Sequence, residues 1–135
     1  PAWKPMRIAL WPSLSASENA RECEELVSQN DRFTIFVSEE GERLTGFIEV
    51  GLRLYAEGCE TSPVGYIEGW YVAPEHRKTG TGRELVKVAE DWARSQGCSE
   101  MASDSILENV EGQQAHIRLG YTEVERQVCF RKSLI

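Results

Sequence analysis

The chain has 135 residues and a formal net charge of −7, from 22 acidic residues against 15 Lys and Arg. This length fits one domain, expected over residues 1–135, that can bury a core without disulfides or metal. With 41% hydrophobic and 27% charged residues, the composition excludes disordered, collagen-like and disulfide-scaffold proteins. The acidic balance argues against nucleic acid, which needs a basic surface, and favours cationic partners.

The sequence carries no membrane or targeting signal. No apolar run approaches the ~18 residues of a membrane span, and residues 1–5, Pro-Ala-Trp-Lys-Pro, have neither a signal core nor a transit pattern. The four cysteines form no Cys-x-x-Cys pair, which indicates free thiols in a reducing compartment. We therefore predict a cytoplasmic protein with no metal site and no membrane partner.

Two helices are predicted at the start of the chain. Residues Met6–Leu10 predict the end of a short helix, because Pro12 follows. The sequence Ser15-Ala16-Ser17-Glu18 has the pattern of a capping box, which predicts a second helix running to about Val27.

Three strands are predicted next, at Phe33–Ser38, Leu44–Leu54 and Val64–Val72. In the second of them Leu, Gly, Ile and Val occupy the even positions, a pattern of period two that predicts a half-buried strand. In the third, the same alternation predicts one face made of Tyr66, Glu68, Trp70 and Val72.

The second half alternates helices and strands. An apolar stripe after Gly82 predicts a helix, a short strand is expected at Glu100–Ser103, and a helix is expected at Val110–Leu119. A last strand is predicted at Tyr121–Lys132, with Val124, Val128 and Phe130 on its apolar face. The fold class is therefore α/β (α+β), with a mixed, mostly antiparallel sheet flanked by helices.

A basic, glycine-rich turn lies between the third strand and the next helix, with the sequence Arg77-Lys78-Thr79-Gly80-Thr81-Gly82-Arg83. Unpaired N–H groups at a helix N-terminus bind anions, and glycine lets a pyrophosphate approach the backbone. A P-loop is excluded because no Gly-Lys-Ser/Thr follows. From these residues alone, an ordinary glycine turn with a solvated basic helix start stays open.

The strand, its Val-x-Pro exit and the Arg-x-x-Gly-x-Gly turn together resemble the acetyl-CoA-binding motif of the GNAT N-acetyltransferases. Glu108-Asn109 and Ala115–Tyr121 are similar to the family's fourth helix and its closing Leu-Gly-aromatic. Leu10-Trp11-Pro12, Ile67-Glu68-Gly69 and Met101–Asp104 resemble the aminoglycoside 6′-N-acetyltransferases within that family. The resemblance implies a GNAT fold whose usual first strand is missing here.

The resemblance also implies an activity: acetyl transfer from acetyl-CoA to the 6′-amine of an aminoglycoside antibiotic, by a homodimer. Two alternatives stay open. One is a GNAT enzyme acting on a polyamine, peptide or lysine amine, and the other is a catalytically silent acetyl-CoA sensor.

An alkyl ammonium with a pKa near about 10.4 must lose a proton before it attacks a thioester, so the reaction needs a base. The resemblance gives this role to Glu68, and gives Asp104 substrate binding, with base as a second option. His116 stands where many relatives place a general acid, although an exposed helix histidine is an alternative reading. Asp104 also suits a helix or turn cap.

The resemblance implies that the remaining candidate residues bind the two substrates. For acetyl-CoA they include the backbone N–H groups of Tyr71 and Val72, facing the developing oxyanion, and Asn109, for which a helix cap is an equal alternative. The acetyl-CoA candidates are Trp70, Tyr71, Val72, Arg77, Lys78, Thr79, Gly80, Thr81, Gly82, Arg83 and Asn109. The aminoglycoside candidates are Trp11, Tyr55, Tyr66, Glu68 and Asp104.

Overall fold

The computed structural model describes residues 3–135 in two parts, one ending at Asp104 and one covering Ser105–Ile135, and each is described by itself. Pro1 and Ala2 lie outside the described residues, together with the part of the N-terminal prediction that rests on them. Across residues 3–135, no helix has both the length and the apolar character needed to cross a bilayer.

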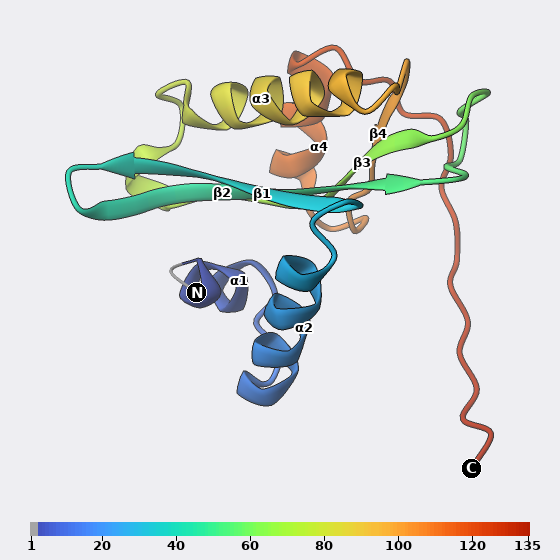
Figure 1. Ribbon diagram of the computed structural model, residues 1–135, viewed down its shortest axis with the longest axis horizontal. Coiled ribbons are helices and arrows are strands. Elements are labelled where there is room, and N and C mark those ends of the chain that lie inside the picture. Colours follow the sequence, from blue (N-terminus) through green and yellow to red (C-terminus); the bar gives the residue numbers. More distant parts are fainter. Residues whose placement is uncertain (1–2) are drawn as a thin grey trace. The chain divides into compact units, whose positions relative to one another are not determined.

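The first part is a four-stranded sheet with helices on both faces (Figure 1). Strands β1, β2 and β3 are antiparallel, and β4 runs parallel to β3 after the crossover through α3. Helices α1 and α2 lie on one face of the sheet and α3 lies on the other (Figure 1). The elements are α1 (Lys4–Leu10), α2 (Ala16–Ser28), β1 (Phe33–Glu40), β2 (Arg43–Arg53), β3 (Val64–Val72), the 3₁₀ turn η1 (Pro74–His76), α3 (Thr81–Ser95) and β4 (Met101–Ser103).

The predicted capping box is confirmed at the start of α2. The backbone N–H of Glu18 donates to Ser15 Oγ at 3.1 Å, and the Ser15 N–H donates to Glu18 Oε1 at 3.1 Å. The mixed, mostly antiparallel sheet flanked by helices is confirmed as well. In the described residues, no strand precedes α1, and β1 is an edge strand of the sheet.

The prediction that the second strand is half-buried is wrong. Residues 45–51 of β2 are all buried. On one face Phe47 packs in a cluster with Trp3, the N-cap of α1, and Cys23 of α2. On the other face Leu85 of α3 lies so close to Gly46 that a Cβ there would be 3.2 Å from its methyl carbon. Because helices cover both faces of the sheet, neither face of β2 is exposed to solvent, and the alternation of residue types does not separate a buried face from an exposed one.

A β-bulge at Glu68 changes which face the residues of β3 occupy. Glu49 of β2 pairs with Gly69 and the next residue, Val50, pairs with Ile67, so Glu68 is an extra residue without a partner on β2. A bulge interrupts the alternation of side chains along its strand. The prediction that Trp70 shares a face with Glu68 is therefore wrong.

Contacts on the two sides of β3 agree with this change of alternation. A Cβ on Gly69 would lie 2.5 Å from the ring of Trp11, which follows α1. A Cβ on Gly82 of α3 would lie 3.1 Å from the ring of Trp70, on the opposite face.

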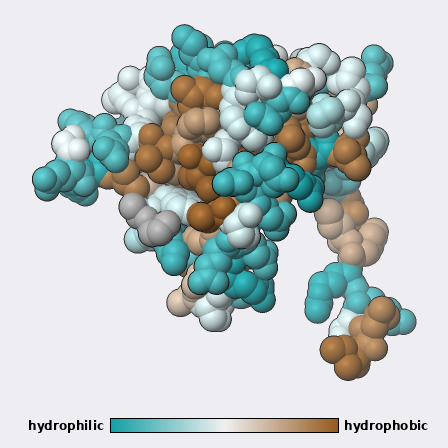
Figure 2. Space-filling view, in the orientation of Figure 1, coloured by the Kyte–Doolittle hydropathy of each residue, from teal (hydrophilic) through white to brown (hydrophobic). Residues whose placement is uncertain are grey.

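The second part contains α4 (Val110–Arg118), as predicted, but not the predicted strand at Tyr121–Lys132. Val124, Val128 and Phe130 are 61%, 78% and 91% exposed. These residues belong to the segment 121–135, which has no helix or strand and is called the C-terminal arm below. Apolar residues are visible at its surface (Figure 2). The apolar residues do alternate along the sequence. A strand, however, needs a neighbouring strand to satisfy its backbone groups, and none is present in Ser105–Ile135.

A buried charge network fixes α1 on the sheet. Glu49 in β2 is 2% exposed and accepts hydrogen bonds from Trp3 Nε1 at 2.9 Å and Arg7 Nε at 2.7 Å. The same guanidinium donates to Asn19 and Glu22 of α2 at 2.8 and 2.9 Å. Burial raises the pKa of the Glu49 carboxyl, and the charge of Arg7 opposes that shift. The network therefore joins both helices to the middle of the sheet.

Replacing Glu49 tests this network. Glu49→Ala leaves the Arg7 guanidinium buried without its main counter-ion, and breaking a buried ion pair costs about 3 kcal/mol or more. Urea denaturation should show that loss in the free energy of unfolding. The control Glu24→Ala, at an exposed position of α2, should change the free energy of unfolding by less than about 0.5 kcal/mol. Equal effects of the two variants would contradict the role given to Glu49.

Candidate functional site

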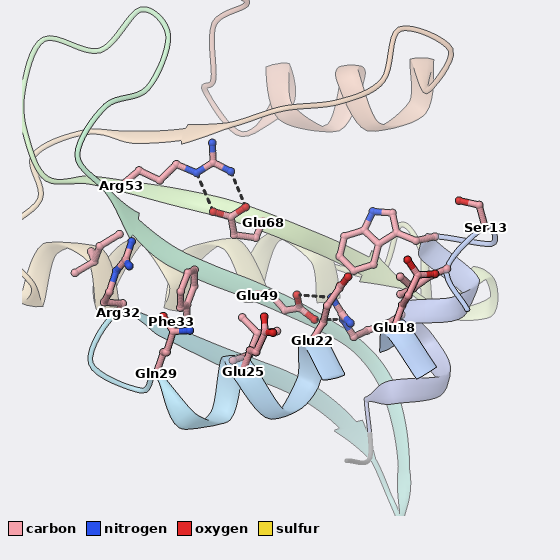
Figure 3. Close-up of a pocket in the computed structure, with 15 residues that line it drawn as sticks. Ser13, Glu18, Glu22, Glu25, Gln29, Arg32, Phe33, Glu49, Arg53 and Glu68 are labelled. Carbon is pink, nitrogen blue, oxygen red and sulfur yellow. Dashed lines mark hydrogen bonds and ion pairs between the residues drawn. The ribbon is translucent and has the colours of Figure 1, made fainter. Parts of the chain in front are cut away.

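A pocket of about 760 Å³ lies between α2, the segment after α1 and strands β2 and β3 (Figure 3). Acidic side chains outnumber basic ones in its lining. The carboxylates are Glu18, Glu22, Glu25, Glu49 and Glu68, and the cations are Arg7, Arg32 and Arg53. A concave surface with this charge attracts cationic ligands.

The pocket holds Glu68, the predicted base, in an ion pair. Arg53 Nε and Nη2 donate to the two carboxylate oxygens of Glu68 at 2.9 and 2.8 Å, a bidentate contact (Figure 3). The side chain of Glu68 is 25% exposed and that of Arg53 is 41% exposed. The hydrogen bond from Arg53 to Glu68 raises the pKa of the guanidinium.

Asp104 joins the same group of side chains. The Tyr66 hydroxyl donates to Asp104 Oδ2 at 2.6 Å, and the Arg53 guanidinium lies 3.5 Å above the centre of the Tyr66 ring. Burial, and then the hydrogen bond to Asp104, raise the pKa of Tyr66. The structure thus links Glu68 and Asp104, which are 36 positions apart in sequence, through Arg53 and Tyr66.

The other predicted aminoglycoside-binding residues differ in their placement. Trp11 lines the pocket and has the Arg7 guanidinium 4.8 Å from the centre of its ring. The ring of Tyr66 is only 3% exposed, so its hydroxyl reaches Asp104 from inside the fold. Tyr55 is 68% exposed and is not among the residues that line this pocket.

The glycine-rich turn connects β3 to α3 and has the backbone that an anion site needs. Gly80, the N-cap of α3, has a φ of 93°, and its side-chain position is open, with nothing within 4 Å of a Cβ built there. No side chain caps α3, so its first N–H groups face outward without a capping acceptor. Arg77 Nε donates to the carbonyl oxygen of Val72 at 2.8 Å, which holds this basic side chain beside the end of β3.

The predicted acetyl-CoA residues of the first part, from Trp70 to Arg83, surround this turn. Strand β4 pairs with β3 only over Gly65–Ile67. In the part of the chain up to Asp104, the β4 side of β3 therefore has no strand partner from Glu68 to Val72. An open strand edge beside an anion-binding turn fits a ligand with amide groups along an arm that ends in a pyrophosphate.

Two predicted residues lie in the second part of the chain. Asn109 caps α4, because its side chain accepts a hydrogen bond from the Gly112 N–H at 3.0 Å. His116 Nδ1 lies 2.6 Å from the Gly112 carbonyl oxygen, and its ring meets Tyr121 edge-on. The helix-cap reading of Asn109 is therefore confirmed.

Sequence reasoning missed Arg53 and the carboxylates of α2. The signal for the latter was present, since Glu18, Glu22 and Glu25 recur at the spacing of one helix face. Arg53 ends a strand and carries no motif, and only the pairing of β2 with β3 brings it to Glu68.

The thiols and the acidic residues form no metal centre in the described residues. All four cysteines are free. Residues 3–135 contain no group of three or more His, Cys, Asp or Glu side chains that could hold a metal ion.

The fold can be compared with known protein families. The family description "Acetyltransferase (GNAT) family" matches residues 3–121. The chain belongs to the GNAT family.

Two similar proteins are named as aminoglycoside N(6′)-acetyltransferases. An aminoglycoside N(6′)-acetyltransferase type 1 from Klebsiella aerogenes is 44% identical over 98% of this chain and 90% of its own length. The enzyme of the same name from Serratia marcescens is 39% identical over 98% and 92%.

A solved structure of AAC(6′)-Iy in complex with the bisubstrate analogue CoA-S-monomethyl-acetylneamine superposes with a TM-score of 0.92. It is 33% identical and the match covers 98% of this chain and 90% of that one.

The Tyr66–Asp104 contact can be tested by titration. The charge of Asp104 raises the pKa of Tyr66, so Asp104→Asn should lower that pKa. Carbon-13 NMR of labelled tyrosine ring carbons can follow Tyr66 against pH, with Tyr66→Phe to assign its signal. Asp91→Asn, which removes an exposed carboxylate of α3, should leave the Tyr66 titration in place, and no change in Asp104→Asn would contradict the contact.

Proposed function

We propose that this chain is an aminoglycoside 6′-N-acetyltransferase that uses Glu68 to accept a proton from the 6′-ammonium. One observation carries the proposal: the bulge aims Glu68 into an acid-lined pocket, beside the strand edge that leads to the glycine-rich turn. The named relatives, which match along nearly the whole chain, support the same activity.

Acetyl-CoA supplies the acetyl thioester, and residues of this chain suit its pyrophosphate and arm. Gly80 leaves the backbone at the start of α3 accessible, whereas Gly82 packs against the Trp70 ring. Arg77, Lys78 and Arg83 add positive charge to a chain whose net charge is −7. The backbone N–H of Val72 is proposed to donate toward the carbonyl oxygen of the thioester, where negative charge develops. The N–H of Tyr71 points toward β2 instead, because Ala73, two residues further on, donates to Thr45 of β2 at 2.8 Å and alternate residues of a strand point the same way.

The proton of the substrate ammonium is proposed to pass to Glu68, directly or through a water molecule, before nitrogen attacks the thioester carbon. Asp104 is proposed to bind a second positive group, held in place by the hydrogen bond from Tyr66. His116 is the candidate donor of a proton to the departing thiolate. Trp11 and Tyr55 are proposed to contact the sugar rings.

The rest of the acceptor fits the charge of the pocket. Aminoglycosides carry several ammonium groups, and Glu18, Glu22 and Glu25 present carboxylates along the α2 side of the cavity. The same charge disfavours nucleic acid and anionic membrane surfaces as partners. Acetylation of the drug would give antibiotic resistance.

We further propose one acetyltransferase domain over residues 1–135, since the family match spans both described parts. A homodimer is supported by the C-terminal arm, whose exposed Val124, Val128 and Phe130 alternate as a strand needing a neighbour. A cytoplasmic location is supported by four free thiols.

Release of free thiol from acetyl-CoA tests the activity. The acceptors are an aminoglycoside with a 6′-amine, an analogue that carries a 6′-hydroxyl, spermidine and a lysine peptide. We expect thiol release only with the 6′-amine. Release with spermidine or the peptide alone would overturn the substrate, and no release despite acetyl-CoA binding would favour a sensor.

In the same assay Glu68→Gln should lower kcat by at least about tenfold, because general-base catalysis contributes about 10²–10⁴-fold. Its affinity for acetyl-CoA should not change. Glu24→Gln, at an exposed position of α2 that is not among the residues lining the pocket, is the matched control and should retain the wild-type rate. Unchanged turnover in Glu68→Gln would remove Glu68 from the mechanism.

A further inference from the structure

The pocket that suits a cationic amine already holds a cation on the carboxylate that the amine needs. Arg53, the last residue of β2, contacts both oxygens of Glu68, at 2.9 and 2.8 Å (Figure 3). Its guanidinium also rests on the Tyr66 ring at 3.5 Å. A bidentate guanidinium–carboxylate contact is among the stronger hydrogen-bonded pairs in proteins.

A guanidinium and an alkyl ammonium compete for the same acceptor atoms. While Arg53 holds both oxygens, Glu68 is a neutralised ion pair that attracts an incoming ammonium less than a bare carboxylate does. An acceptor amine that passes its proton to Glu68 must first take at least one of these oxygens from Arg53.

We propose that Arg53 is a placeholder cation, which occupies on Glu68 the position that the substrate ammonium takes during binding. This inference rests on the proposed function, because it assumes that Glu68 faces the acceptor amine. Only hydrogen bonds are exchanged in this step, with no covalent bond made or broken.

The guanidinium has another place to rest once it leaves Glu68. It is stacked on Tyr66, whose hydroxyl is bonded to Asp104, and the charge of Asp104 also acts on Arg53. The side chain is 41% exposed at the end of its strand, so a small movement over the ring separates it from Glu68 without disturbing the core.

The placeholder favours acceptors with several positive charges. A monoamine gains only its contact with Glu68, and this one contact must offset the loss of the Arg53–Glu68 ion pair. A polycation can offset the displacement with contacts to other carboxylates of the lining, such as Glu18, Glu22 and Glu25. Displacing Arg53 therefore costs binding free energy, which an acceptor must offset with other contacts before its amine reaches Glu68.

Calorimetric titration with an aminoglycoside that carries a 6′-amine, in the absence of acetyl-CoA, tests the placeholder. Arg53→Met removes the competitor, so the Kd should tighten by about three- to tenfold, the range expected for one hydrogen bond of ordinary net strength at a partly exposed position. Arg53→Lys keeps the charge but lacks the planar fork, so its Kd should fall between the two. Thermal unfolding checks that each variant is folded.

The matched control is Arg32→Met. It removes the same charge from the lining of the same pocket, but Arg32 stacks on Phe33 and not on Tyr66. A tightening in Arg53→Met no larger than in Arg32→Met would show a general field effect and overturn the placeholder. The gain should also vanish when Arg53→Met is made in a Glu68→Gln background.

Failure of this inference can be told from failure of the proposed function. Normal thiol release with an unchanged or weaker Kd in Arg53→Met would overturn the placeholder alone. Loss of kcat at unchanged Kd would make Arg53 a residue that orients Glu68 and would also overturn it. If the aminoglycoside binds to neither the wild type nor the variants, both proposals fall.

Discussion

The site depends on one extra residue in β3. Because Glu68 has no partner on β2, the side chains before and after it are offset by one position. Trp70 lies against α3 at Gly82, next to the glycine-rich turn, whereas Gly69 lies under Trp11 in the face that carries the pocket. The bulge thus divides a single strand into a portion that faces the pocket, where we propose that the acceptor binds, and a portion beside the glycine-rich turn, where we propose that acetyl-CoA binds.

Charges as well as packing hold α1 and α2 on the face of the sheet that carries the pocket. Glu49 is buried in the middle of β2 and binds Trp3 and Arg7 of the N-terminal segment. This places Trp11, four residues after Arg7, at the rim of the pocket. The buried ion pair of Arg7 with Glu49 costs desolvation free energy, but it positions this part of the pocket. The second ion pair, Arg53 with Glu68, is partly exposed, so a ligand can compete for it.

Much of the fold follows from local sequence signals. The capping box at Ser15, the strand at Val64–Val72 and the glycine at the start of α3 each determine structure within a few residues, and the structure agrees with them. The family could be inferred from the same turn and from Ile67-Glu68-Gly69. Asp104 was a candidate only through that resemblance, although the structure does bring it to the Tyr66 hydroxyl.

The remaining features depend on partners distant in sequence. A bulge is a property of two strands, so β3 alone gave no sign that Trp70 would leave the face of Glu68. Full burial of β2 required knowing that helices cover both sides. The strand predicted at Tyr121–Lys132 needs a neighbour that its own part of the chain does not provide, and Arg53 meets Glu68 only through the register of β2.

The most direct test of the account is the position of the acetyl group on the product. After reaction with acetyl-CoA and an aminoglycoside that carries amines on several rings, two-dimensional NMR can correlate the new acetyl carbonyl with the neighbouring carbon-bound protons. A single product acetylated on the 6′-nitrogen is the predicted result. Acetylation at another amine, or a mixture of positions, would contradict the account, because Glu68 would then not select the amine that reacts.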